Sequence, residues 1–262
     1  MRPLRELDPA SIRDLAGVVF DVDDTLTTHG RLHPEAFEAL WALHRAGIAL
    51  AAVTGRPLGW ADVMAMTWPI DVAVGENGAG WCMRRGGALA HGWFDDQGTR
   101  ARHAAVLARV EAAVREAMPE VRVASDQPGR RCDLAFDVGE AERLGAAEIA
   151  RLVSIIDESG ARALVSSVHA HVIAGSWDKA RGAARAVEDA LGAPLERGRW
   201  IFVGDSGNDA EAFAWFERTV GVANVREHLS RLPVPPRFVT EQERGAGFAE
   251  LAAHVLSARG RG

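Results

Sequence analysis

GVVFDVDDTLTT, at residues 17–28, joins an apolar run to three carboxylates within four residues. The run at residues 18–20, bounded by polar residues, predicts a buried strand of a parallel sheet. Asp21, Asp23 and Asp24 follow at the C-terminal end of this strand, where unpaired buried charges are costly. Oxygen ligands at this density suit a hard cation such as Mg²⁺, and open α/β sheets form their sites at the carboxyl ends of strands. The stretch therefore predicts a metal site at one edge of a sheet.

Apolar runs of strand length alternate with amphipathic helix patterns over most of the chain. Such alternation predicts an α/β fold, with a doubly wound parallel sheet and right-handed crossovers. The expected strands are residues 17–22, 48–53, 71–74, 200–203, 220–222 and 238–239, with a hairpin of strands 81–84 and 88–91 around Gly86 and Gly87. The expected helices are residues 34–45, 57–66, 179–191, 209–216, 225–231 and 247–257.

The pattern changes between residues 92 and 174, where short strands and longer helices form a unit of their own. We expect an inserted α+β module there, a cap on a core built from residues 1–91 and 175–262. The expected elements of the module are helices at residues 99–118 and 141–158 and strands at 121–124, 132–138, 162–165 and 169–174.

Composition restricts the class of protein. The 262 residues are 48% hydrophobic, which is ample for a core, and the net charge of −6 argues against binding to nucleic acid or anionic membranes. No window approaches 18 apolar residues and the first residues lack the apolar core of a signal peptide, so we expect a cytoplasmic protein. Cys82 and Cys132 form neither a disulfide framework nor a metal motif, and we expect two buried thiols. These features leave the oligomeric state open.

Lys179 is the single lysine among the 30 basic residues of the chain. A general preference for arginine explains the other basic residues but not the lysine that is kept. Lysine is a compact point charge on a flexible stem, whereas arginine is a broad planar fork. Retention of lysine at this position favours a requirement for the smaller ammonium group. The alternative is that one lysine survives by chance.

Polar clusters follow apolar strands or open helices of the expected sheet, and in a parallel sheet they can all meet at one edge. They are Asp21 with Asp23, Thr54, Lys179, and Asp205 with Asn208 and Asp209. Carboxylates from two distant strands make a divalent metal site, Thr54 and nearby backbone amides can hold phosphoryl oxygens, and Lys179 can neutralise the remaining charge. Phosphoryl transfer needs these parts: in-line positioning, a metal ion and cations for the equatorial oxygens.

Four motifs, in order along the chain, resemble those of the haloacid dehalogenase (HAD) superfamily. DVDDTLT at residues 21–27 is similar to the first motif, DxDxT, and VTGR at 53–56 to the second. Lys179 in SWDKARGA is similar to the third, and GDSGNDAEAF at 204–213 to the fourth, GDxxND. GENGA at 75–79 is typical of the type IIB branch, which includes sucrose-phosphate and mannosylglycerate-phosphate phosphatases. The resemblance implies a HAD-like (Rossmannoid) core with an α/β cap between the second and third motifs.

The resemblance also implies a role for each matching residue. Asp21 is expected to be the nucleophile that forms an aspartyl-phosphate, and Asp23 the group that protonates the leaving oxygen and then activates water. Mg²⁺ is expected to bind Asp21, the Asp23 carbonyl and Asp205, with Asp209 in the metal shell. The residues expected to contact the substrate are Thr54, Gly55, Arg56, Lys179 and Asn208. Apart from the resemblance, Arg130 and Arg131 follow the SDQPG turn of the cap and could reach toward a phosphorylated sugar, with a solvated loop as the alternative.

The expected function is that of a Mg²⁺-dependent phosphatase acting on a small phosphorylated metabolite, either a sugar phosphate or a glycosyl phosphate. The retained Asp23 favours ester hydrolysis, because the dehalogenases and phosphonatases of the superfamily lack this acid. A phosphomannomutase-like phosphotransferase is the alternative within the same branch. A non-catalytic regulatory protein that binds sugar phosphates is the alternative from another class, although pure binding needs neither a nucleophile nor an acid.

Two further patterns have competing interpretations. DVDDT could begin a calcium loop, but the sixth and twelfth places of such a loop would be Leu26 and Leu32, so this interpretation fails. His169 and His171 share one face of an expected strand, and a role in strand packing is favoured over half of a metal site.

Overall fold

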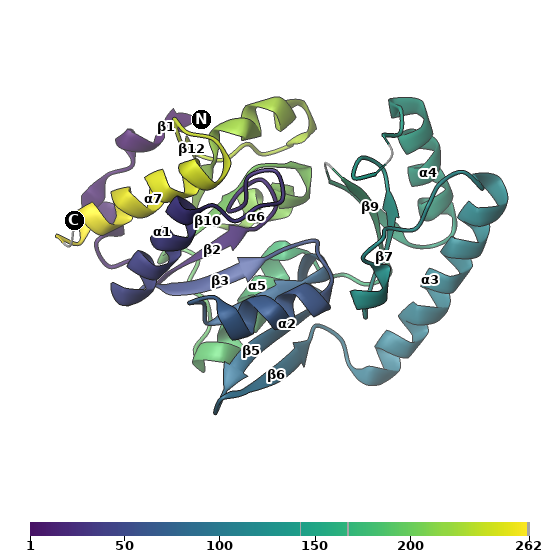
Figure 1. Ribbon diagram of the computed structural model, residues 1–262, viewed down its shortest axis with the longest axis horizontal. Helices are drawn as coiled ribbons and strands as arrows, with labels where there is room; N and C mark the ends of the chain where they lie inside the picture. The colour runs from purple at the N-terminus through teal and green to yellow at the C-terminus, as the bar shows by residue number, and fades with distance from the viewer. Residues whose placement is uncertain (142, 167, 261–262) are drawn as a thin grey trace.

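The computed structural model describes residues 1–141, 143–166 and 168–260. Figure 1 shows a large sheet flanked by helices and, beside it, a smaller sheet with helices of its own. Glu142 and Ser167 of the predicted cap, and Arg261 and Gly262 of the predicted core, lie outside the described residues. In the part that is described, every helix is too short or too polar to cross a bilayer.

The predicted doubly wound α/β fold is confirmed in the large sheet and the helices that flank it. Its described strands are β1 (Arg2–Pro3), β2 (Gly17–Asp21), β3 (Ala49–Val53), β4 (Val72–Gly75), β5 (Gly80–Arg85), β6 (Ala88–Trp93), β10 (Trp200–Gly204), β11 (Arg218–Gly221) and β12 (Phe238–Val239). They lie in the order β1-β12-β11-β10-β2-β3-β4-β5-β6, with parallel neighbours from β1 to β4 and antiparallel pairing of β5 and β6.

The central strands are apolar because helices cover both faces of the sheet. All five residues of β2 and all five of β10 are buried, as continuous apolar runs in parallel sheets should be. Phe20 of β2 packs against Phe248, with ring centroids 5.2 Å apart. The helices are α1 (Pro34–Arg45), α2 (Leu58–Thr67), α5 (Lys179–Leu191), α6 (Ala210–Trp215) and α7 (Arg244–Ala258), and α1, α2 and α7 lie on the near side of the sheet in Figure 1.

The direction of winding reverses between β2 and β10, which are neighbours in the sheet. The chain runs from β2 through β3 to β4 on one side and from β10 through β11 to β12 on the other. In open α/β sheets, ligands bind in the crevice at the carboxyl ends of the strands at such a switch point. The residues that follow β2 and β10 are therefore placed where a site is expected.

The smaller sheet is antiparallel, with the strand order β7-β9-β8. Its strands are β7 (Leu134–Asp137), β8 (Arg162–Val165) and β9 (His169–Ile173), and its helices are α3 (Gln97–Ala117) and α4 (Ala146–Glu158). One face of the sheet and the two helices enclose a second apolar cluster, which includes Val110, Val114, Phe136, Leu152, Ile156, Ala170 and Val172. Side chains alternate along a strand, so His169 and His171 of β9 lie on the opposite face.

Two expected elements in this region differ in the structure. The strand expected at residues 121–124 is reduced to one bridge, between Val123 and Phe136, because Pro119 precedes it and the turn Gln127–Gly129 follows closely. The helix expected from residue 225 to 231 is a 3₁₀ helix, Ala223–Arg231. In addition, β6 continues to Trp93, two residues beyond the core boundary expected at residue 91.

Helix α5 approaches the turn Glu76–Gly78 very closely, because neither side of the contact carries a side chain. A Cβ atom on Gly182 would lie 2.3 Å from the Cα atom of Gly78, and a Cβ atom on Gly78 would lie 2.3 Å from the carbonyl oxygen of Asp178. Gly78 also has φ near +111°, a conformation that L side chains rarely adopt. This pair of glycines sets the height of α5 above the sheet, and Lys179 is the first residue of α5.

We expect the substitution Gly182→Ala to lower the free energy of unfolding by about 1–3 kcal/mol, because the new methyl group meets backbone that cannot move aside. Helix propensity alone would predict the opposite sign, a gain of about 1 kcal/mol. Gly59→Ala in α2 is the matched control, since its Cβ would lie no closer than 3.5 Å to the nearest atom. Urea denaturation of both variants measures the difference, and equal stabilities for the two would contradict this account of the close approach.

Candidate active site

Three buried carboxylates meet at the switch point. Asp21 ends β2, Asp205 follows β10, and Asp209 lies in the 3₁₀ turn that leads into α6. No more than 3% of any of the three residues is exposed, and one carboxylate oxygen of each lies within 4.8 Å of the others. Strand packing thus brings Asp21 close to Asp205 and Asp209, which lie 184 and 188 positions further along the chain. The like charges of the three carboxylates need compensation.

Lys179 supplies part of this compensation from the first turn of α5. Its Nζ atom lies 2.6 Å from Asp21 Oδ1 and 2.7 Å from Asp209 Oδ1, and its side chain is fully buried. Burial alone would lower the pKa of Lys179, but Asp209 and Asp21 outweigh it and raise the pKa above its usual range. The single lysine of the chain is therefore a charged group that links two of the three carboxylates.

The cluster keeps an excess of negative charge. Burial, followed by the neighbouring Asp209 and Asp23, raises the pKa of Asp21 to about 7, against the opposing effect of Lys179. Burial and the charges of Asp21 and Asp209 raise the pKa of Asp205 well above its ordinary value. When all three carboxylates are ionised, they and one ammonium leave two negative charges, which a divalent cation would balance, and the donors are all oxygens, as Mg²⁺ prefers. The residues present therefore fit such an ion.

Hydrogen bonds fix the orientation of these carboxylates. The backbone amides of Asp205 and Ser206 donate to Asp209 Oδ2 over 2.9 and 3.1 Å. Asn224 Nδ2 donates to Asp205 Oδ2 over 2.9 Å, and the Thr25 hydroxyl lies 3.4 Å from Asp21 Oδ2 and 3.3 Å from Asp205 Oδ1. Both oxygens of Asp209 are thus engaged, which suits it to holding Lys179 and the Asp205 loop in place.

Asp23 lies beside this cluster and is held from the next strand. Arg56 Nε lies 3.1 Å from Asp23 Oδ1, and the Thr54 hydroxyl lies 3.4 Å from Asp23 Oδ2. The Arg56 amide donates to the Thr54 oxygen over 3.0 Å, so the turn after β3 orients both side chains. Asp24 is engaged elsewhere, because its Oδ1 accepts from Arg244 Nε over 3.3 Å.

A small cavity lies between these residues and the smaller sheet. It is mostly polar, and its lining comes from both parts of the structure. The lining residues are Asp21, Asp23, Gly55, Arg56, Ser166, Val168, His169, His171, Ser206 and Asn208. Of the residues that the sequence singled out, Asp21, Asp23, Gly55, Arg56 and Asn208 line the cavity, and residues of the predicted cap close its other side.

The two histidines of β9 are oriented by carboxylates. His171 Nδ1 lies 3.1 Å from Asp133 Oδ2, and His169 Nε2 lies 3.0 Å from Glu140 Oε2. Glu140 Oε1 also pairs with Arg56 Nη1 at 2.9 Å, and Arg56 and His169 lower the pKa of Glu140 although partial burial opposes them. Asp23, Arg56, Glu140 and His169 thus form a chain of contacts from the large sheet to the small one.

The two arginines predicted to reach the substrate lie in other contacts. Arg130 is buried, pairs with Asp126 at 3.1 Å and Asp133 at 2.9 Å, and donates to the carbonyl oxygen of Gly55 over 2.9 Å. Arg131 pairs with Asp62 at 2.8 Å. Neither is among the cavity-lining residues in the described part of the chain, and contact of either arginine with substrate stays a prediction.

Glu76 has a role that the sequence did not reveal. It is fully buried, and its carboxylate accepts hydrogen bonds from the amides of Leu58, Arg131, Cys132 and Asp133. Burial and the neighbouring Asp133 raise its pKa to about 7. The residue ties the large sheet to the loop before β7. It stands in the GENGA segment, which was noted as a motif without any function being inferred for the glutamate.

Asn224 and Glu140 were also missed. Asn224 follows β11, so the rule that singled out Asp205 after β10 could have found it. Glu140 lies in the loop after β7 and has no distinguishing sequence context, since only the approach of the two sheets places it beside Arg56.

Comparison with known proteins agrees with this fold. Residues 18–86 match the family model of haloacid dehalogenase-like hydrolases, and the predicted resemblance to that superfamily is confirmed. A Thermoplasma acidophilum protein, 0175, superposes with a TM-score of 0.71 at 18% identity, over 92% of this chain and 98% of that one. The sucrose-phosphatase of Synechocystis sp. PCC6803 gives 0.65 at 16% identity, over 91% and 96%. The subclass IIB sugar phosphatase BT4131 gives 0.58 at 18% identity, over 91% and 98%. At these identities the solved structures show a shared fold.

We expect Lys179→Met to lower the free energy of unfolding by about 3–5 kcal/mol in buffer that contains a chelator, because it leaves buried carboxylates uncompensated. Arg181→Met is the control on the same helix, since its side chain is 57% exposed and it should cost no more than about 1 kcal/mol. Chemical denaturation checks both values. A loss for Lys179→Met as small as that of the control would show that the ammonium does not stabilise the cluster.

Proposed function

We propose that this haloacid dehalogenase-like hydrolase is a Mg²⁺-dependent phosphatase that hydrolyses a small phosphorylated metabolite, a sugar phosphate or glycosyl phosphate. One observation carries the proposal. Asp21 is held by Lys179 at 2.6 Å, at the carboxyl edge of the sheet, and shares a cavity with Asp23. A protein that only binds phosphate has no need for a carboxylate at this place, because it would repel the anion.

Asp21 is the nucleophile in this proposal. One of its carboxylate oxygens attacks phosphorus, the bond from phosphorus to the ester oxygen breaks, and an aspartyl-phosphate forms. Asp23 donates its proton to the leaving oxygen. In the second step Asp23 takes a proton from water, the water oxygen attacks phosphorus, and the acyl-phosphate bond breaks to release phosphate and restore Asp21. Arg56 and Thr54 contact the Asp23 carboxylate and hold it for both transfers.

The phosphoryl group would be bound by the polar groups that surround Asp21. Lys179, the Thr54 hydroxyl, the Gly55 amide and Asn208 are the donors we assign to its oxygens, as the resemblance to the superfamily implies. Asn208 accepts from the Ser206 hydroxyl over 2.8 Å, which orients its amide group toward the neighbouring Asn77. Fixed donors of this kind stabilise charge that develops in the transition state without reorganising.

Mg²⁺ is the cofactor that the carboxylate cluster suits. Asp21, Asp205 and the backbone carbonyl of Asp23 would hold it, and Asp209 would support that shell through the amides of Asp205 and Ser206. When bound, the ion supplies charge neutralisation for the phosphoryl oxygens. The remaining two negative charges of the cluster give the physical reason for expecting it.

Residues 92–174 would act as the cap that selects the leaving group. It contributes three polar residues to the cavity, Ser166, His169 and His171, together with one apolar residue, Val168. Such a lining favours a leaving group rich in hydroxyls over a lipid or an aromatic alcohol. The sucrose-phosphatase with the same fold was solved with sucrose and phosphate, which supports the same substrate class. Closure of this side would exclude bulk water during the first step.

We expect Asp21→Asn to abolish phosphate release from a panel of phosphorylated sugars and metabolites while the thermal unfolding profile stays cooperative. The amide cannot act as the nucleophile, and the substitution keeps the side-chain shape. Activity equal to wild type would disprove the aspartyl-phosphate route. Release from no compound by the wild type, followed by isomerisation of a hexose phosphate when a hexose bisphosphate is added, would favour the mutase alternative instead.

We also expect EDTA to remove activity, Mg²⁺ to restore it and Ca²⁺ not to restore it, because Ca²⁺ takes looser coordination with more ligands. The same preparation serves for all three measurements, with phosphate release as the readout. Full activity after exhaustive chelation would exclude a metal-dependent mechanism.

A further inference from the structure

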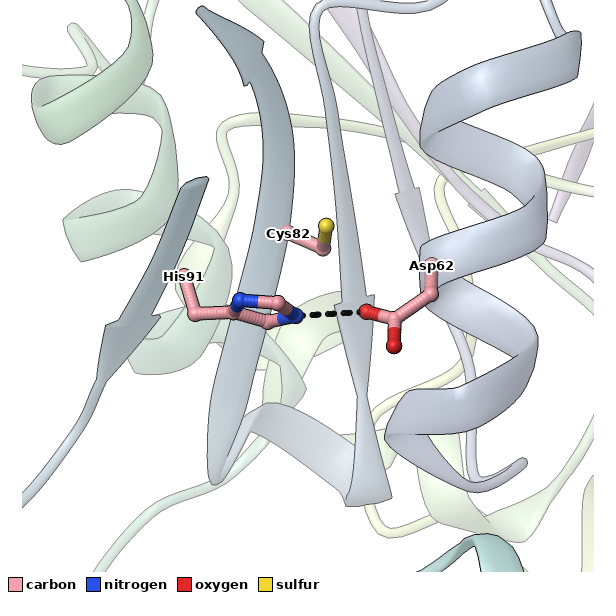
Figure 2. A group of neighbouring side chains, drawn as sticks. All are labelled: Asp62, Cys82 and His91. Carbon is pink, nitrogen blue, oxygen red and sulfur yellow. Dashed lines mark hydrogen bonds and ion pairs between the residues drawn. The ribbon is translucent and has the colours of Figure 1, made fainter. Parts of the chain in front are cut away.

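A second group of potential metal ligands lies on the large sheet, apart from the catalytic cavity. Asp62 comes from α2, Cys82 from β5 and His91 from β6. Figure 2 shows the three side chains converging, with the imidazole and the carboxylate directed at each other and the sulfur atom beside them. One ligand atom of each residue lies within 4.8 Å of the others.

The fold makes this convergence inevitable once the hairpin forms. Cys82 and His91 are directly opposite in the antiparallel register of β5 and β6, so their side chains stand on the same face of the sheet. Helix α2 packs on β4 and β5 and presents Asp62 to that face. His91 Nε2 lies 2.7 Å from Asp62 Oδ1, and the second carboxylate oxygen pairs with Arg131 Nη2 at 2.8 Å.

We propose that Asp62, Cys82 and His91 form a binding site for Zn²⁺, with water as the fourth ligand. Zn²⁺ at the usual bond lengths to S, N and O places its ligand atoms about 3.4 Å apart in a tetrahedron, which is within the 4.8 Å limit that these atoms satisfy. The hydrogen-bonded pair, now 2.7 Å apart, opens by about 0.7 Å to admit the ion. Cys82 is fully buried, whereas 28% of the His91 side chain is exposed, so the open position faces solvent.

The chemistry of the donors selects the ion. A thiolate and an imidazole suit Zn²⁺, while Mg²⁺ prefers oxygen ligands and would not compete effectively here. One thiolate and one carboxylate balance the two charges of the ion. Arg131 then remains as an outer contact that orients the Asp62 carboxylate, as groups behind metal ligands commonly do. The catalytic aspartates and this group would therefore hold different ions.

The alternative is that the Cys82 thiol has only a packing role and binds no metal ion. Burial and the Asp62 carboxylate raise the pKa of the Cys82 thiol to about 12, so without a cation the cysteine is protonated beside its neighbour. Cys132 is the matched comparison within the chain, because it is also a buried free thiol and burial likewise raises its pKa to about 12. A test must therefore detect bonding to sulfur and separate the two cysteines.

The test is a Co²⁺ titration of metal-free full-length protein in excess Mg²⁺, followed by near-ultraviolet absorption. Co²⁺ takes Zn²⁺ sites, and a thiolate ligand gives a charge-transfer band that aspartate ligands cannot give. We expect the band in wild type and in Cys132→Ser, its absence in Cys82→Ser, and its loss when Zn²⁺ is added. No band in wild type, or a band that survives in Cys82→Ser, would overturn the proposal.

A second pair of variants protects the test against misfolding of the buried cysteine variant. His91→Ala and Asp62→Asn remove ligands from the more exposed side of the group and should each weaken Co²⁺ binding at least about tenfold. Zn²⁺ should raise the melting temperature of wild type but not that of His91→Ala. Unchanged Co²⁺ affinity in both variants would also refute the site, and none of these measurements depends on phosphatase activity.

Discussion

The repulsion among Asp21, Asp205 and Asp209 is the constraint on which the rest of the structure depends. All three are buried at one edge of the sheet, where their charges are tolerated only if cations and donors surround them. Lys179 reaches them because Gly182 lets α5 lie against Gly78. The two glycines and the single lysine are therefore parts of one arrangement. The close approach of α5 to Gly78 places the compact Lys179 ammonium between the carboxylates, where a planar guanidinium would pack differently.

The smaller sheet completes the cavity through two kinds of contact. Glu76 binds it through backbone amides, so this link depends on the path of the loop before β7 and not on the side chains of that loop. Arg56 contacts the region of the smaller sheet through an ion pair with the Glu140 side chain. The same guanidinium also pairs with the Asp23 carboxylate. The first contact fixes the position of the smaller sheet. The second joins that position to the orientation of the proposed general acid.

Local sequence explains the large sheet well and the contacts between the sheets poorly. The strands β2 and β10 follow from buried apolar runs, and their order implies that Asp21 and Asp205 meet. The contact between Arg56 and Glu140 joins residues 84 positions apart and depends on how two separate sheets pack. The strand expected at residues 121–124 had the right composition but room for only one bridge. The Arg56–Glu140 contact and the single bridge at residues 121–124 depend on how separate elements pack and on their register, and a local sequence pattern predicts neither.

Cys82 and His91 lie on a hairpin that the sequence predicted, but their meeting with Asp62 was not predicted. Their spacing along the chain resembles no metal motif, and the cysteines were expected to be buried thiols. The pairing of β5 with β6 places the two residues opposite each other, and α2 adds a carboxylate from a third element. The carboxyl edge of the large sheet collects oxygen donors because it lies at the ends of parallel strands. The hairpin lies beyond the last parallel strand, where cross-strand neighbours decide which side chains meet, and a sulfur and a nitrogen can be combined there without disturbing the aspartates.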